Sequence, residues 1–153
     1  MWMTSEQIAL YPKFAAYVRE SMPTCKSVPR IIKALKDHGG LAEPQARDAL
    51  SWGHMPLVVV VDLWNEVEWK SEGNGEFDPK RPYQIHIAKH RVNQFETPGA
   101  GGMDTTATGA KVYIVGATLL HEICHWGLHK MGIKEVGEAG KAFEQAVYGR
   151  QIN

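Results

Sequence analysis

The chain has 153 residues, of which 44% are hydrophobic, and its 17 basic side chains balance its 17 acidic ones to a formal net charge of zero. This length and composition suit a single globular domain over residues 1–153 that buries a core without disulfide bonds. The neutral charge disfavours a nucleic-acid-binding protein, which is normally basic, and no stretch reaches the ~18 apolar residues that a membrane span requires.

The first half of the chain predicts several helices and then a buried strand. We expect helices over about residues 5–21 with a break at Pro12, over 27–40, and over 42–52. Proline near the start and glycine at the end delimit the second of these, because proline suits a first turn and glycine a helix end. The run "PLVVVVDLW", residues 56–64, predicts a strand, since β-branched side chains suit a pleated sheet.

The second half predicts one more strand and two helices, separated by loops. Residues 70–82 are polar and rich in turn-forming residues, residues 83–89 alternate like a strand, and residues 97–109 have the composition of a flexible connection. We expect helices over about 110–131 and 136–149. The chain therefore predicts an α+β fold with N-terminal helices and a small mixed β-sheet.

The segment "LLHEICHWGLHK", residues 119–130, carries the motif HExxH late in the longest predicted helix. His121 and His125 are four residues apart, so both imidazoles lie on one helix face and can bind one metal ion. Glu122 lies about 100° around the helix, where it can act on a ligand of the metal without binding the metal itself. The spacing predicts a zinc site with Glu122 as general base, because a His–Glu pair in an apolar helix is unfavourable unless paired or metal-bound.

Two further residues of this segment are candidate ligands that helix geometry disfavours. Cys124 points about 100° away from His125, so we expect a small core residue. His129 shares the face of the two histidines but lies about 6 Å beyond His125 along the axis, so we expect it on the surface or beside the ligands. The third protein ligand that a catalytic zinc usually has must come from another part of the chain.

Downstream glutamates supply the candidates for that third ligand, namely Glu135, Glu138 and Glu144. If residues 137–149 are helical, Gly137 and Gly140 lie in line with Glu144 and would let this helix approach the metal-bearing helix closely. This favours Glu144. Glu138 lies on a different face, so we expect only one of the two to bind the ion, and Glu138 and Glu135 remain alternatives.

"HEICH" followed by "GKAFE" resembles the gluzincin metallopeptidases, in which a second helix supplies a glutamate ligand. With "FEQAVYG", the pattern is similar to the zincin-type toxin domains of bacterial polymorphic toxins and type VI secretion effectors. The resemblance covers roughly residues 83–149 and implies a zincin-like α+β fold. It implies a Zn²⁺ cofactor bound by His121, His125 and Glu144, which lies 19 residues after His125, with Glu122 as the catalytic base.

The resemblance implies hydrolysis of peptide bonds. Zinc polarises the scissile carbonyl and activates a bound water, whose proton Glu122 accepts and passes to the leaving amine. Tyr148, one turn after Glu144, is a candidate catalytic residue for the developing oxyanion, and an ordinary half-buried tyrosine is an equal alternative. The peptide is expected to add as a strand to a sheet edge at residues 83–90, where His86 and His90 are expected to be exposed.

The same resemblance implies an antibacterial toxin, the C-terminal module of a larger effector, with a peptide or protein substrate, a carrier protein and a cognate immunity protein. The start of the chain lacks a basic segment followed by an apolar run, so we expect no signal peptide. We expect the protein in the cytoplasm of the producing cell. After delivery by a secretion system, we expect it in a target cell, for example in the periplasm. Alternatives are a housekeeping intracellular zinc peptidase, a cell-wall amidase and a zinc-stabilised binding module without turnover.

Overall fold

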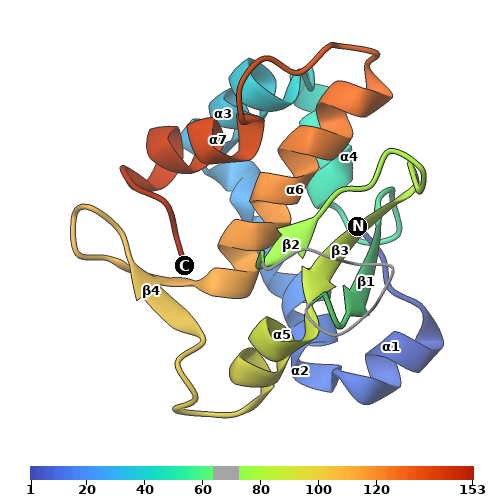
Figure 1. Cartoon of the computed structure of the whole chain (residues 1–153), viewed down its shortest axis with the longest axis vertical. Coiled ribbons are helices and arrows are strands. Elements are labelled where there is room, and N and C mark those ends of the chain that lie inside the picture. Colours follow the sequence, from blue (N-terminus) through green and yellow to red (C-terminus); the bar gives the residue numbers. More distant parts are fainter. Residues whose placement is uncertain (64–72) are drawn as a thin grey trace.

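A computed structural model of the chain describes residues 1–63 and 73–153 (Figure 1). In these residues the helices are α1 (Ser5–Leu10), α2 (Pro12–Ala16), α3 (Pro29–Gly39), α4 (Glu43–Leu50), α5 (Lys89–Glu96), α6 (Ile114–Lys130) and α7 (Ala139–Tyr148). The strands are β1 (Leu57–Val61), β2 (Gly75–Glu76), β3 (Gln84–Ala88), β4 (Met103–Thr105) and β5 (Lys111–Tyr113). The fold is α+β, as predicted. The predictions for residue 64 and for residues 70–72 lie outside the described residues.

The N-terminal helices begin and end near the prolines and glycines of the sequence. Pro12 separates α1 from α2, as predicted. The chain then continues as a π-helical turn over Tyr17–Ser21 and a 3₁₀ segment over Met22–Ser27. α3 ends at Gly39, and Gly40 terminates it in the left-handed conformation with φ 65°.

β3 is the central strand of a three-stranded sheet with the order β1–β3–β2. It pairs in parallel with β1, with Ile85 opposite Val58, and antiparallel with β2, with Ile87 opposite Gly75. Both edges of β3 are therefore occupied, and the prediction that residues 83–90 form a free sheet edge is wrong. Among the described strands, β2 pairs with β3 alone, so β2 is the edge strand on this side of the sheet.

The face of β3 that was predicted to be exposed is buried. Four consecutive residues of the strand are buried, and only 1% of the surface of His86 is exposed. Burial lowers the pKa of His86 to about 4, so this imidazole is neutral at neutral pH. The alternation of polar and apolar residues predicts the strand correctly but not the burial, because a central strand is covered by other parts of the fold on both faces.

Residues 89–113 are more regular than their composition predicts. Residues 89–96 follow β3 directly as helix α5, and β4, which lies in the segment predicted to be flexible, pairs with β5 as an antiparallel hairpin. The hairpin turn is closed by the Thr106 amide, which donates to the Ala110 carbonyl at 2.8 Å. The second strand takes up the first turn of the helix predicted over 110–131, so α6 begins at Ile114.

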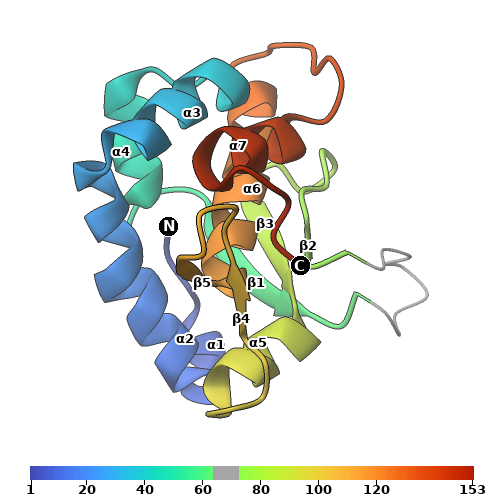
Figure 2. The ribbon, with the colours of Figure 1, turned by 90° about the vertical axis from the view of Figure 1, so that its left-hand side faces the viewer.

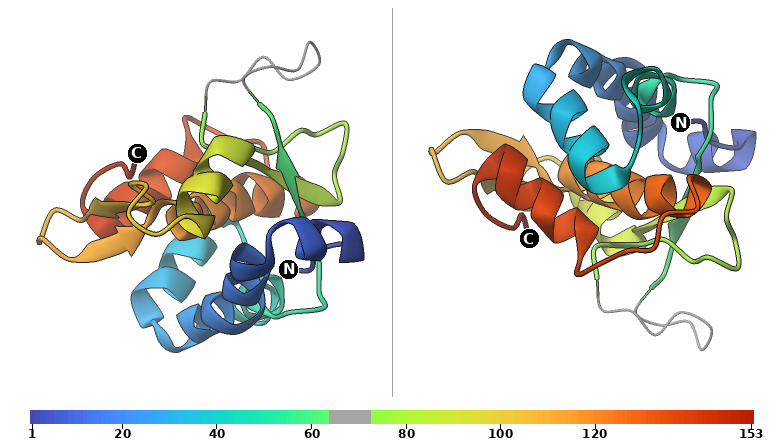
Figure 3. Two further views of the ribbon diagram at one scale, coloured as in Figure 1. Left: turned by 90° about the horizontal axis from the view of Figure 1, so that it is seen from below. Right: turned by 90° about the horizontal axis from the view of Figure 1, so that it is seen from above.

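Helix α6 lies in the middle of the molecule (Figure 2). The N-terminal helices cover it on one side and the three-stranded sheet on the other, as both views of Figure 3 show, while α7 packs beside it. Leu119 and Ile123 on α6 are fully buried, and each such side chain contributes about 1.5–3 kcal/mol of stabilisation. The core therefore fixes α6 firmly, and with it the histidines that the helix carries.

Candidate metal centre

His121 and His125 lie on one face of α6, as their spacing predicts, with ring centroids 5.1 Å apart. The two Nε2 atoms point at the same atom, Oε1 of Glu138, at 3.0 Å from His121 and 2.8 Å from His125. One ligand atom from each of the three residues lies within 4.8 Å of the other two. The fold thus brings two imidazoles and one carboxylate together at a single point.

Glu138 reaches this point from the start of α7, where it is the N-cap residue. Its second oxygen, Oε2, accepts a hydrogen bond from the Lys141 amide at 2.5 Å. Burial alone would raise the pKa of Glu138, but the charge of His121 and the Lys141 hydrogen bond outweigh burial and lower it. One carboxylate oxygen is therefore fixed by the helix end, and the other is directed at the two histidines.

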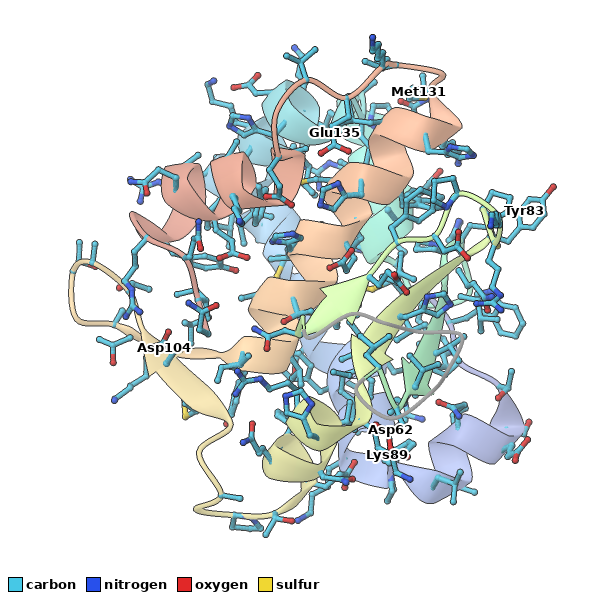
Figure 4. The ribbon with its side chains drawn as sticks, in the orientation of Figure 1. Asp62, Tyr83, Lys89, Asp104, Met131 and Glu135 are labelled. Carbon is cyan, nitrogen blue, oxygen red and sulfur yellow. The ribbon has the colours of Figure 1, made fainter. Side chains whose placement is uncertain are left out.

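The outer nitrogen of each imidazole contacts another carboxylate. His121 Nδ1 lies 2.6 Å from Oε1 of Glu144, and His125 Nδ1 lies 3.0 Å from Oε2 of Glu135. Glu135, which Figure 4 shows on the connection between α6 and α7, also accepts a hydrogen bond from the Ala139 amide at 2.8 Å. Carboxylates in this position fix the orientation and the tautomer of metal-binding histidines.

The arrangement fits a divalent cation. All four ring nitrogens of the two histidines face carboxylate oxygens, so hydrogen bonds alone would satisfy them only if both rings were imidazolium ions. Burial would lower the pKa of His121, but the Glu144 hydrogen bond and the neighbouring carboxylate charges raise it to about 9. A metal ion between the Nε2 atoms and Glu138 would supply the same positive charge, and two histidines with one glutamate are a known ligand set of catalytic zinc.

The structure places Glu144 on the other side of the His121 ring from Glu138. Glu144 contacts the Nδ1 side of His121, whereas Glu138 occupies the Nε2 side that the two histidines share. The prediction assumed a helix from residue 137, but α7 begins two residues later, and Gly137 has φ 78°. This left-handed residue redirects the chain, so that Glu138 faces α6 from the N-cap instead of from within the helix. Glutamate is not a preferred N-cap residue, and the local pattern therefore does not predict this role.

Glu122 is buried beside the histidines, with 4% of its surface exposed, and it lines the cavities on both sides of them. Burial raises the pKa of Glu122 to about 7, against the opposing effect of the two imidazoles. Strand β2 lies directly against this side chain, because a Cβ atom at Gly75 would sit 3.0 Å from Cγ of Glu122. The absence of a side chain at Gly75 therefore lets the edge strand approach the glutamate.

Gly140 lets α7 pack directly on His121. A Cβ atom at Gly140 would lie 2.1 to 2.4 Å from three atoms of the His121 ring, so any larger residue would displace the ring. The predicted close approach of the two helices is confirmed at this glycine. Gly137 lies outside the helix with open space around it, so it does not contribute to this close approach. Its role is to turn the chain before α7.

Three other candidate residues lie outside this group. Tyr148 packs against Phe143, with ring centroids 6.3 Å apart, and burial raises its pKa; it does not line the two cavities beside the histidines. Cys124 is fully buried in the core, as predicted. His129 is exposed on the last turn of α6, and its ring lies 5.3 Å from that of Phe77.

Two cavities flank the histidines and share Gly75, His121, Glu122 and Glu138 as walls. The larger has a volume of about 430 Å³, which is within the usual range of ligand-binding sites, and the smaller has about 270 Å³. Apolar residues contribute to the larger cavity, whereas Lys141 and the end of the chain contribute to the smaller one. The candidate metal centre is therefore reached from two sides that differ in chemical character.

The family model described as metallopeptidase toxin 3 matches residues 7–149 of the chain. The match includes every histidine and glutamate of the group described above and leaves out residues 150–153. No curated protein and no solved structure matches the chain. Over the part of the chain that the structure describes, none of the helices has the length and apolarity that crossing a membrane requires.

Proposed function

Because the chain belongs to the metallopeptidase toxin 3 family, we propose that it hydrolyses peptide bonds with a zinc ion held by His121, His125 and Glu138. The observation that carries the proposal is the convergence of both Nε2 atoms on one Glu138 oxygen, at 3.0 and 2.8 Å. Two histidines and one glutamate leave a fourth position of zinc free for the reaction.

Of the three glutamates considered as third ligand, Glu138 takes that role in this proposal. Glu144 and Glu135 lie at the outer nitrogens of the two rings, at 2.6 and 3.0 Å, and their role is to hold the rings in the correct orientation and tautomer. Tyr148 has no catalytic role in the proposal, because its side chain packs against Phe143 and not beside the histidines.

The chemistry follows from the residues around the centre. When bound, zinc polarises the scissile carbonyl and makes water a stronger acid. Glu122 accepts the proton of the attacking water as its oxygen bonds to the carbonyl carbon, and it returns that proton to the nitrogen as the C–N bond breaks. Glu122 lines both cavities beside the histidines, a position that suits both steps. The products are a carboxylic acid and an amine, and no covalent intermediate with the protein is needed.

The edge strand β2 supports binding of an extended peptide. Its residues Gly75 and Glu76 line the larger cavity, and Gly75 lies against the Glu122 side chain. A substrate strand that pairs with this edge would pass beside the two histidines, with backbone hydrogen bonds supplying much of the affinity.

The name of the family also bears on the biological role. We propose that the protein acts as an antibacterial toxin, delivered to a target cell by a secretion system with the help of a carrier protein. A cognate immunity protein that covers the cavity beside His121 and His125 would protect the producing cell. These partners follow from the proposed toxin role.

We expect the purified protein to cleave unfolded protein substrates, such as casein, only when it contains zinc. Treatment with 1,10-phenanthroline should reduce cleavage by at least about 100-fold, because removing the metal removes the polarisation of the carbonyl, and one equivalent of zinc should restore it. Fragment termini identified by mass spectrometry should correspond to hydrolysed peptide bonds. Cleavage that persists without metal, or a protein that binds less than one equivalent of zinc, would rule out the proposed site.

A further inference from the structure

The larger cavity beside the metal centre has an apolar end. Leu128 lies about one turn beyond His125 along α6, and it lines the cavity together with Phe77 and Ile133. Phe77 follows β2, and Ile133 belongs to the connection between α6 and α7, so three separate segments build this wall. We call Phe77, Leu128 and Ile133 the apolar subsite. It is continuous with the residues proposed to bind zinc, because all of them line one cavity.

The apolar subsite is built into the fold and not a chance exposure of one side chain. Ile133 and Leu128 both rest on Gly40, since a Cβ atom there would lie 2.6 Å from Cδ1 of Ile133 and 3.3 Å from Cδ2 of Leu128. A backbone hydrogen bond of 2.9 Å from the Ile133 amide to the Leu128 carbonyl fixes the two relative to each other. Ile133 nevertheless remains 46% exposed, so an apolar surface faces solvent directly beside the metal centre.

We propose that the apolar subsite selects peptide substrates with a large apolar side chain, such as leucine or phenylalanine, next to the scissile bond. Covering the exposed surface of Ile133 with an apolar side chain removes it from water, which is favourable. Four glutamates also line the cavity, and Glu135 and Glu138 among them contact the histidines and accept hydrogen bonds from amides of α7. A preference for a basic side chain is therefore the competing outcome of the test. The position of the scissile bond in this proposal rests on the proposed function.

Fluorogenic peptides that differ at one position, with Leu, Phe, Ala, Asp or Lys, test the proposal on the zinc-loaded protein. We expect kcat/KM for Leu or Phe to exceed that for Ala by about 10- to 100-fold at one position beside the cleaved bond. Ile133→Ser should remove most of this preference, so that the ratio of kcat/KM for the Leu peptide to that for the Ala peptide falls close to one. Val136→Ser is the matched control, because Val136 lies in the same connection, is 91% exposed and does not line the cavity.

Peptide binding to the Glu122→Gln protein, measured by fluorescence anisotropy, separates the subsite from the reaction. Binding that favours Leu and Phe and is weakened by Ile133→Ser, while the zinc-loaded protein with Glu122 intact cleaves none of the peptides, would support the subsite and reject the proposed function. Cleavage without an apolar preference, or with a preference for Lys or Asp, would reject the subsite and keep the function. Phe77→Ala gives a second variant, which should shift the preference toward larger side chains. Neither binding nor cleavage of any peptide would reject both.

The end of the chain carries an independent inference. Residues 150–153 lie outside the family match, yet Ile152 is buried and its amide donates a hydrogen bond to Oε2 of Glu144 at 2.7 Å. The other oxygen of Glu144 contacts Nδ1 of His121 at 2.6 Å. A continuous chain of hydrogen bonds therefore runs from the terminal segment through Glu144 to a proposed zinc ligand.

Arg150 and Asn153, which lie before and after Ile152 in the chain, form hydrogen bonds with β4. Arg150 Nη1 donates to Oδ1 of Asp104 at 3.2 Å and to the Thr105 carbonyl at 2.8 Å, and the Asn153 amide donates to Oδ2 of Asp104 at 3.0 Å. Figure 4 shows Asp104 on β4, and Figure 1 shows the end of the chain between β4 and α7. The terminal segment is thus held in place by contacts that do not involve the metal centre.

We infer that Ile152 is a positioning residue, whose amide orients Glu144 and through it His121. This rests on the proposed zinc site. Removing residues 151–153 should weaken zinc binding by about 10-fold, and it should have no further effect in the Glu144→Gln protein, because both changes break the same chain of contacts. Fully additive effects, or unchanged affinity, would overturn the inference. In metal-free protein, loss of the His121 Nδ1 proton resonance on truncation provides a test that holds even if the zinc site is wrong.

Discussion

Replacing Glu122 with glutamine should abolish proteolysis while leaving zinc bound. The amide has the shape of the carboxylate but cannot accept and return a proton, and loss of a general base typically lowers the rate by about 10²- to 10⁴-fold. Because the proposed ligands His121, His125 and Glu138 are unchanged, the variant should still bind one equivalent of zinc. Peptide kinetics with metal analysis of the same sample measures both effects, and expression in bacterial cells should no longer inhibit growth.

The control for this experiment is Glu20→Gln, which changes an exposed carboxylate whose side chain is 66% accessible. The unfolding temperature of the variant shows whether activity is lost because the base is missing or because the fold is damaged. Burial raises the pKa of Glu122 from 4.5 to about 7, so the native state binds more protons than the unfolded state in this interval, and the folded protein loses stability as the pH rises through it. The metal-free Glu122→Gln protein should therefore unfold at the same or a higher temperature above pH 7. A zinc-loaded variant with more than one tenth of wild-type activity would contradict the assigned role.

Replacing Glu138 with glutamine should weaken zinc binding much more than the same change at Glu144. Glu138 Oε1 faces both Nε2 atoms, so Glu138→Gln removes a charged ligand, and we expect affinity to fall by more than about 100-fold. Glu144 contacts the far nitrogen of His121, and changes to such supporting carboxylates typically cost about 10- to 100-fold. Competition with a chromophoric chelator measures both affinities on one scale.

The pair is well matched, because each variant changes a carboxylate to an amide on the same helix or its cap, and each residue contacts the same imidazole. Glutamine at residue 138 keeps an oxygen that can accept the Lys141 amide, so the cap of α7 is retained. A larger loss of affinity in Glu144→Gln than in Glu138→Gln would return Glu144 to the role of third ligand. Equal and complete loss in both would indicate that the site does not tolerate either change.

The periodicity of the chain was enough to locate most of the fold. The apolar segment around HExxH predicts a buried helix, and α6 begins only a few residues later than expected because a short hairpin precedes it. The valine run predicts β1, and the proline and glycine near its two ends predict α3. These features are local, since a helix or strand pattern depends on neighbouring residues. The burial of β3 could not be predicted from local patterns, because the burial of His86 depends on segments remote in the sequence.

The sequence by itself determined that His121 and His125 face one point and that Glu122 lies beside it, because four residues make about one turn of any α-helix. The tertiary structure alone decided which carboxylate contacts both histidines. That choice depends on the left-handed turn at Gly137, on the cap that Glu138 forms on α7, and on the packing of Gly140 against His121. It also decided that, among the described strands, β2 and not β3 is the edge strand beside Glu122. Each of these is a contact between segments that fold together, and no local pattern in the chain encodes such a contact.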